Sequence, residues 1–65
     1  MTIKLNGQSR EVASQSIEEL LREVEAPRAG IAVALNGRVV RRGEMQSTLL
    51  QPNDEIEIIR AVQGG

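Results

Sequence analysis

The chain has 65 residues, enough for a single domain with a small core, and a formal net charge of −1. It contains no His, Cys, Phe, Tyr or Trp, so its core must be aliphatic, and disulfides, cysteine-based metal sites and nucleophiles paired with His are excluded. The charge gives no basis for nucleic-acid binding, and no apolar run approaches the about 20 residues of a membrane span. We therefore expect a soluble cytoplasmic protein that binds neither nucleic acid nor membranes and catalyses no reaction alone.

The first part of the chain predicts a β-hairpin. Residues 2–5 alternate between apolar and polar side chains, which is the period of a half-buried strand. Asn6 and Gly7 follow, and both tolerate the positive φ of a two-residue hairpin turn. Residues 8–13 then predict a returning strand, with Val12 as its core candidate.

A helix is predicted to begin at Ser16 and to end at Pro27. The Ser16 hydroxyl can accept the N–H of Glu19, whose side chain can reach back to complete a capping box. Glu18 and Arg22 have the i, i+4 spacing of an exposed ion pair. The apolar stripe expected to pack on a sheet consists of Ile17, Leu20, Leu21 and Val24.

The central stretch predicts a second hairpin. Residues 30–35 (GIAVAL) are apolar on both faces, as in a strand that is buried or covered by a partner on both sides. The Asn36-Gly37 turn leads into a short strand over residues 38–41. The arginines that cluster here are Arg38, Arg41 and Arg42. Two interpretations are open: these charges protect a sheet edge from aggregation, or they dock an acidic partner.

The end of the chain predicts an irregular segment and a last strand. Residues 43–53 form the irregular segment, with core candidates Met45, Leu49 and Leu50. Residues 54–62 form the strand, in which Ile56 and Ile58 share one face. Ile59 falls on the other face, where it is either a bulge or ordinary surface, or a contact for a partner.

Together these elements predict an α+β roll with a mixed sheet of about five strands and one main helix packed on one face. The first and last strands can pair in parallel, because the helix and the second hairpin leave room for a crossover. We expect one domain over residues 1–63, followed by a flexible tail of Gly64 and Gly65.

The glycine pair at the end suits a chemical role. A carboxylate at a chain end is a poor electrophile, because its carbonyl carbon lacks a good leaving group. An enzyme that activates this carboxylate must bring it to a nucleotide phosphate inside a narrow cleft. Gly64 and Gly65 have no Cβ and can thread where other residues would clash.

The segments GIAVALNGRVVRR and LLQPNDEIEII, together with the terminal Gly64-Gly65, resemble the ThiS family of sulfur carriers in thiamine biosynthesis. The resemblance covers essentially the whole chain. This chain departs from the family at Asn53-Asp54, where Gly-Asp is common, and at Met45, where an aromatic residue is frequent. Asn tolerates the left-handed turn, so the expected fold is unaffected.

The resemblance implies a ubiquitin-like β-grasp fold and a cycle of reactions at Gly65. A ThiF-type adenylating enzyme would use ATP and magnesium to join AMP to the Gly65 carboxylate, and a persulfide donor would replace AMP with sulfur. A ThiG-type thiazole synthase would then take the sulfur from the thiocarboxylate. Gly64 would give access, and the chain itself, a monomer when free, would hold no cofactor or metal. The candidate partner contacts are Ile59, Ala61 and Val62.

Several alternatives share parts of this pattern. The small subunit of molybdopterin synthase and other ubiquitin-like sulfur carriers have the same Gly-Gly end and differ in the enzyme that activates them. A β-grasp interaction module would keep its binding after loss of Gly65, and a protein modifier would form adducts between Gly65 and lysines of other proteins.

Overall fold

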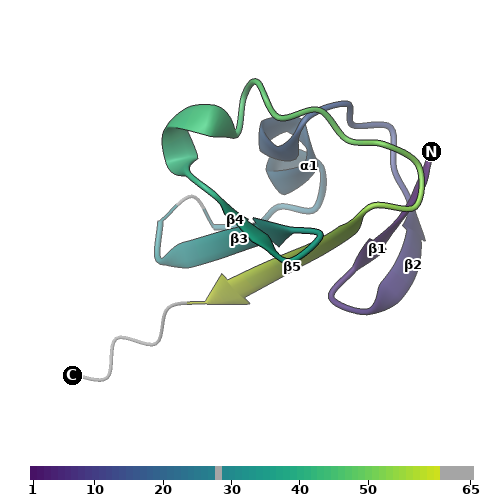
Figure 1. The fold of residues 1–65 in the computed structure, drawn as a ribbon, viewed down its shortest axis with the longest axis horizontal. Helices are drawn as coiled ribbons and strands as arrows, with labels where there is room; N and C mark the ends of the chain where they lie inside the picture. The colour runs from purple at the N-terminus through teal and green to yellow at the C-terminus, as the bar shows by residue number, and fades with distance from the viewer. Residues whose placement is uncertain (28, 61–65) are drawn as a thin grey trace.

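The computed structural model describes residues 1–27 and 29–60 (Figure 1). Its elements are β1 (Thr2–Leu5), β2 (Gln8–Glu11), α1 (Ile17–Glu23), β3 (Ile31–Leu35), β4 (Arg38–Val40), the 3₁₀ turn η1 (Arg42–Glu44) and β5 (Glu55–Arg60). The strands form one five-stranded sheet in the order β2-β1-β5-β3-β4. Helix α1, η1 and the loop before β5 lie on the same side of this sheet. The predicted α+β roll with one helix on a mixed sheet is confirmed.

Strand β5 is the central strand. It runs parallel to β1, with Lys4 opposite Glu55 and Leu5 opposite Ile56. On its other side it runs antiparallel to β3, from the pair Leu35–Ile56 to the pair Ile31–Arg60. The predicted parallel pairing of the first and last strands is therefore confirmed. Because β1 ends at Leu5, β3 is the only strand that accompanies β5 through its last described residues.

Both hairpin turns adopt the predicted conformation and are also fastened to β5. Asn6 and Asn36 each have a φ of 51°, and the glycines that follow them have φ values of 83° and 84°. The side-chain oxygen of Asn6 accepts a hydrogen bond from the N–H of Ile58 at 2.8 Å. The side-chain oxygen of Asn36 accepts one from the N–H of Glu55 at 2.9 Å. Each turn thus closes its hairpin and also accepts a hydrogen bond from a backbone N–H group of β5.

The cap of α1 differs in one detail from the predicted capping box. The Ser16 hydroxyl accepts the N–H of Glu19 at 3.2 Å, as expected. The Glu19 carboxylate, however, accepts the N–H of Gln15 at 2.9 Å and not that of Ser16. The helix ends at Glu23, and Glu25 takes a φ of 57°, so the chain leaves the helix before it reaches Pro27. The expected Glu18–Arg22 ion pair is present at 3.3 Å.

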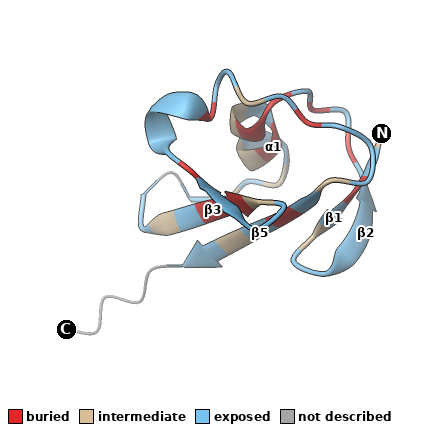
Figure 2. Ribbon diagram, in the orientation of Figure 1, coloured by how far each residue is buried: buried red, intermediate tan, exposed pale blue. Residues whose placement is uncertain are grey.

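The core lies between α1 and the sheet (Figure 2). Its buried members are Ile3, Val12, Ile17, Leu20, Val33, Val40, Met45, Leu50 and Ile56. Leu49 was expected in this core, but 62% of its surface is exposed. Leu49 forms a β-bridge with Ser16, and adjacent residues of an extended segment point to opposite sides, so burial of Leu50 directs Leu49 outward. No helix in residues 1–27 and 29–60 is long and apolar enough to cross a membrane.

Strand β2 ends at Glu11 and does not extend to Ala13 as predicted. The backbone N–H groups of Ala13 and Ser14 are instead hydrogen-bonded to the carboxylate of Glu23. The Glu23 carboxylate at the end of α1 accepts the N–H groups of Ala13 and Ser14 and the Ser14 hydroxyl. The hydrogen bond from the Ser14 hydroxyl, followed by the one from the Ala13 N–H, lowers the pKa of Glu23. This carboxylate therefore ties the connection between β2 and α1 to the helix end.

The lowered pKa of Glu23 predicts how stability depends on pH. A group with a lowered folded-state pKa stabilises fully above its unfolded pKa, and this contribution is lost as the pH falls through the folded value. The Glu23 contribution should therefore decline as the pH falls below about 4.5, the ordinary value. We expect Glu23→Gln to lower the unfolding midpoint at pH 7 and the difference from the parent protein to shrink at acidic pH.

Thermal unfolding followed by circular dichroism between pH 3 and pH 7 would measure this effect. Glu57→Gln is the matched control, because Glu57 is exposed and its side chain makes no hydrogen bond or ion pair with the rest of the described chain. A Glu23→Gln midpoint that stays parallel to the parent curve over the whole pH range would contradict the assignment.

Candidate functional site

The site begins where β5 leaves the sheet. Arg60 is the last residue that the structure describes there. The predicted reactive end, Gly64-Gly65, and the predicted contacts Ala61 and Val62 lie outside the described residues. The described part of the site is therefore the surface that surrounds the last residues of β5, on β3, β4 and β5 (Figure 1).

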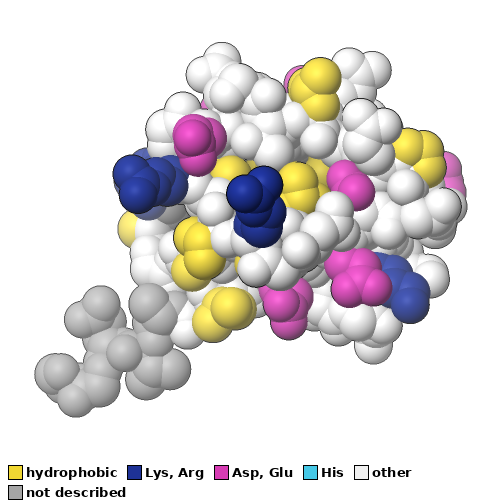
Figure 3. All heavy atoms as spheres, viewed as in Figure 1, with side chains coloured by type: hydrophobic (Ala, Val, Ile, Leu, Met, Phe, Trp, Pro, Cys, Tyr) yellow, Lys and Arg dark blue, Asp and Glu magenta, His cyan; other side chains and the backbone are white. Residues whose placement is uncertain are grey.

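The sheet face opposite α1 carries an uncovered apolar surface. We call it the outer apolar patch, and its exposed members are Ala32, Val39 and Ile59, which lie around Ala34, itself only 8% exposed. Ile59 lies opposite Ala32, and Val39 lies opposite Ala34, so the patch spans three strands, with Glu57 at its border opposite Ala34 on β5. Ile59 is 54% exposed and Val39 is 74% exposed. Apolar side chains are visible beside the end of β5 in the space-filling view (Figure 3).

The alternation along each strand explains the patch. Val33, Val40 and Ile56 point to the core and are buried, so the residue beside each of them points to the outer face. Ile58 is half-buried on the core side, which sends Ile59 outward without any bulge in its pairing with β3. On the outer face of GIAVAL, Ala34 is therefore covered by its neighbours, whereas Ala32 stays exposed. An apolar strand face that its own chain leaves open is typical of a protein-binding surface.

Arg38, Arg41 and Arg42 are all exposed, but they do not lie around one common hollow. Arg38 lies at the start of β4, beside a hollow of about 370 Å³ next to Glu44 and Thr48. Arg41 precedes η1, and Arg42 is its first residue. Arg42 lines a different hollow, on the side of α1. The arginines therefore border β4 and η1 and do not converge on one pocket. Basic side chains flank the apolar ones in Figure 3.

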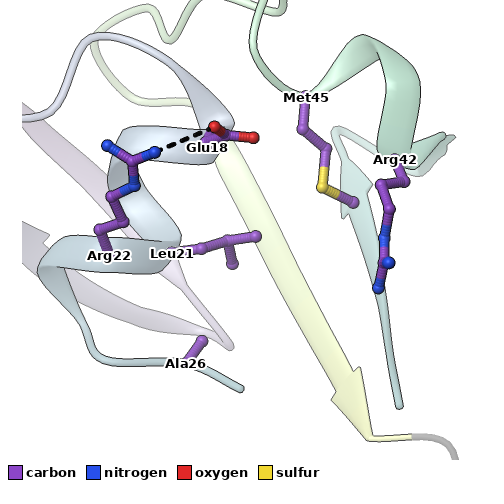
Figure 4. Close-up of a pocket in the computed structure, with 6 residues that line it drawn as sticks. All are labelled: Glu18, Leu21, Arg22, Ala26, Arg42 and Met45. Carbon is purple, nitrogen blue, oxygen red and sulfur yellow. Dashed lines mark hydrogen bonds and ion pairs between the residues drawn. The ribbon is translucent and has the colours of Figure 1, made fainter. Parts of the chain in front are cut away.

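The hollow beside α1 has a volume of about 150 Å³ (Figure 4). Its lining residues are Glu18, Leu21, Arg22, Ala26, Arg42 and Met45. Arg22 turns back to its ion pair with Glu18, and the side chains of Leu21 and Met45 face the space between helix and η1. Met45, which stands where an aromatic residue is frequent in the family that the sequence resembles, is 9% exposed and belongs to the core.

The carboxylates with shifted pKa values are structural. The hydrogen bond from the Thr2 hydroxyl, followed by the one from the N-terminal amine, lowers the pKa of Glu11 on β2. Glu23 fastens the end of α1. Glu11 lies on the edge strand β2, which β1 separates from β5, and in the described part of the chain no group of three acidic residues could hold a metal ion.

Sequence reasoning identified Ile59 but missed Ala32 and Val39 as parts of the same surface. The signal for Ala32 was the two-sided apolar character of GIAVAL, and the signal for Val39 was its place beside Val40 in a short strand. Neither signal says which face the helix covers. The strand register was needed to show that these side chains adjoin Ile59.

The division between the two faces predicts different costs of substitution on β5. Ile56 is 1% exposed, so Ile56→Ala should lower the free energy of unfolding by about 2–5 kcal/mol. Ile59→Ala removes a side chain that is 54% exposed and should cost less than about 1 kcal/mol. Urea unfolding followed by circular dichroism would measure both values. Equal losses for the two variants would show that Ile59 is covered in the folded chain.

The sequence of this chain matches one protein family and is similar to two known proteins. The model of the ThiS family matches residues 3–65. The sulfur carrier protein ThiS of Escherichia coli is 32% identical over 66 residues, which covers all of both chains. The sulfur carrier protein ThiS of Thermus thermophilus is 31% identical over 61 residues, which covers 94% of this chain and 95% of the relative.

Solved structures agree with this similarity. The crystal structure of the thiamine biosynthesis protein ThiS from Geobacter metallireducens superposes with a TM-score of 0.87 and 28% identity, and the match covers all of both chains. The solution structure of a thiamine biosynthesis protein from the same organism gives a TM-score of 0.80, also at 28% identity, and covers all of this chain and 88% of the other.

Proposed function

This chain belongs to the ThiS family, and we propose that it is a sulfur carrier of thiamine biosynthesis that holds sulfur on the carboxyl group of Gly65. The family match extends through residue 65 and so includes the Gly64-Gly65 end. The observation that carries the proposal is the outer apolar patch, which the described residues leave exposed and to which β5, the strand before Gly65 in the chain, contributes Ile59. A carrier needs such a surface, because other proteins must hold it while they act on its end.

The chemistry that we propose begins with activation of the carboxylate. In an adenylating partner, a carboxylate oxygen of Gly65 attacks the α-phosphorus of ATP, and pyrophosphate leaves. The resulting mixed anhydride supplies the leaving group that the free carboxylate lacks. ATP and magnesium are held by the partner, and this chain contributes the nucleophilic oxygen.

Sulfur then replaces AMP. The terminal sulfur of a persulfide attacks the carbonyl carbon of Gly65, and AMP leaves with the electron pair of the broken C–O bond. A thiol of the donor system cleaves the S–S bond of the acyl disulfide, so that the thiol and the donor sulfur form a disulfide and Gly65 keeps a thiocarboxylate. A thiazole synthase takes the sulfur from this group. The absence of cysteine suits the role, because no side-chain thiol competes with the chain end.

The folded body positions this end. The proposed partner contacts are Ile59, which is exposed in the outer apolar patch, and Ala61 and Val62, which follow it in the sequence. Gly64 lets the end enter a narrow cleft without a side-chain clash. The adenylating enzyme and the synthase would use the patch in turn, since both must reach the same chain end.

The first test is the mass of the intact chain. After incubation with a ThiF-type adenylating enzyme, ATP, magnesium and a persulfide donor, we expect a mass gain that matches exchange of one oxygen for sulfur. The matched control carries one added alanine after Gly65, so that the glycine carboxyl is no longer free. Sulfur on the capped variant, or none on the parent chain with any adenylating partner, would contradict the proposal. Activation only by the enzyme of molybdopterin biosynthesis would reassign the pathway.

The second test concerns the outer apolar patch. Ile59→Glu places a charge on the patch, which a partner would have to desolvate, so the KM of the adenylating enzyme for this chain should rise about tenfold, equivalent to about 1.4 kcal/mol. Ser9→Glu is the control, because Ser9 pairs with Lys4 on β1 and lies on the same sheet face at the far edge strand β2. An unchanged KM for Ile59→Glu would remove the patch from the proposal.

A further inference from the structure

We propose that the free edge of β4 is a second docking element, which binds an extended acidic segment of the protein that covers the outer apolar patch. The segment would add to the sheet as a strand next to β4. This inference rests on the proposed function, because the protein that covers the patch is one of the enzymes acting on Gly65. Val39 belongs to both surfaces: its side chain lies in the patch, and its backbone faces the free edge.

The direction of the Val39 backbone follows from the register of the hairpin. Leu35 and Arg38 close a two-residue turn and form a hydrogen-bonded pair, so the next pair, Ala34–Val39, is a non-hydrogen-bonded pair. The N–H and C=O of Val39 therefore point away from β3. Strand β4 is the last of the sheet, and no described residue outside the sheet bonds the backbone of Val39. The edge offers one donor and one acceptor at the spacing that an added strand uses.

A preformed hollow lies along this edge. Its volume is about 370 Å³, and it is lined by Leu35, Arg38, Val39, Val40, Glu44 and Thr48. The wall opposite the hairpin is held in place: the Thr48 hydroxyl donates to the Glu44 carbonyl at 2.6 Å, and the Thr48 carbonyl accepts the N–H of Ile17 at 3.0 Å. A strand added to β4 would direct alternate side chains into this hollow.

The charge of the edge selects an acidic segment. Arg38 and Arg41 are exposed, and in the described part of the chain neither makes an ion pair or a side-chain hydrogen bond. Glu44 is the single carboxylate that lines the hollow. Carboxylates of a partner strand would therefore find two guanidinium groups whose attraction is not already satisfied within the described chain.

The other edge strand of the sheet, β2, differs from β4 in its residue composition. All four residues of β2, Gln8–Glu11, are polar or charged and exposed, as expected for a strand that resists edge-to-edge pairing. Strand β4 instead exposes 74% of Val39, a β-branched apolar residue, between its arginines. This edge therefore lacks the fully polar sequence that protects β2.

The test measures binding of the full chain to the ThiF-type adenylating enzyme and to the ThiG-type thiazole synthase, each by calorimetry without ATP. Val39→Pro removes the outward N–H and leaves the bonds to β3, and we expect its affinity for at least one enzyme to fall at least about tenfold. Ser9→Pro is the control, because Ser9 stands opposite Lys4 on the other edge strand, β2, in the same register position as Val39, and its loss of an outward N–H should leave binding like that of the parent. The double variant R38E/R41E should also bind at least about tenfold more weakly, with a smaller dependence on salt than the parent.

Hydrogen exchange of the unmodified chain gives a readout that does not depend on any variant. The Val39 amide should exchange more slowly in at least one complex than in the free protein. Three results would each overturn the proposal. They are exchange of the Val39 amide as fast in both complexes as in the free protein, parent-like binding by R38E/R41E, and no binding to either enzyme. If Gly65 gains sulfur in the same preparations while Val39 stays unprotected, the edge proposal alone fails. If Gly65 gains no sulfur, the proposed function itself fails.

Discussion

The position of β5 between β1 and β3 is the constraint on which the rest of the structure depends. In the proposed function the chain acts through its end, and this requires that the strand before that end be fixed. Ile56 anchors β5 in the core, and the side chains of Asn6 and Asn36 hold it from both flanks. The strand is therefore secured by backbone pairing, core packing and two turn side chains before it reaches Arg60.

The two faces of the sheet divide the work of folding and recognition. The inner face carries the large aliphatic side chains that α1 covers, and these supply the stability of a domain with no disulfide and no aromatic residue. The outer face of β3 carries the exposed Ala32 beside Ile59, and the buried Ala34 beside Val39. The exposed apolar side chains on this face are available to a partner protein.

The chain supplies very little chemistry of its own, and this agrees with the proposed role. Its described carboxylates with lowered pKa values, Glu11 and Glu23, hold backbone and hydroxyl groups of their own fold. In the proposed cycle, partners carry out activation and sulfur transfer, and they must therefore recognise the body of the carrier. The outer apolar patch and the β4 edge would give such partners two kinds of contact, one apolar and one based on backbone pairing and charge.

The sequence by itself determined the features that depend on near neighbours. Asn-Gly pairs specified both hairpin turns, Ser16 specified the start of α1, and a period of two placed Ile59 on the outer face, because these signals act over a few residues. The role proposed for Gly64-Gly65 also comes from the sequence, but these residues lie outside the described part of the chain, so it stays a prediction.

Only the tertiary structure decided the features that join distant segments. The Asn6 side chain accepts a hydrogen bond from the N–H of Ile58, 52 residues away. Leu49 points outward because its neighbour Leu50 is buried in the core. The joining of Val39 to the patch, and the hollow beside Arg38, arise from strand order and from the loop that η1 begins. Such contacts depend on which surfaces meet when the whole chain packs, and no local pattern of residues encodes that meeting.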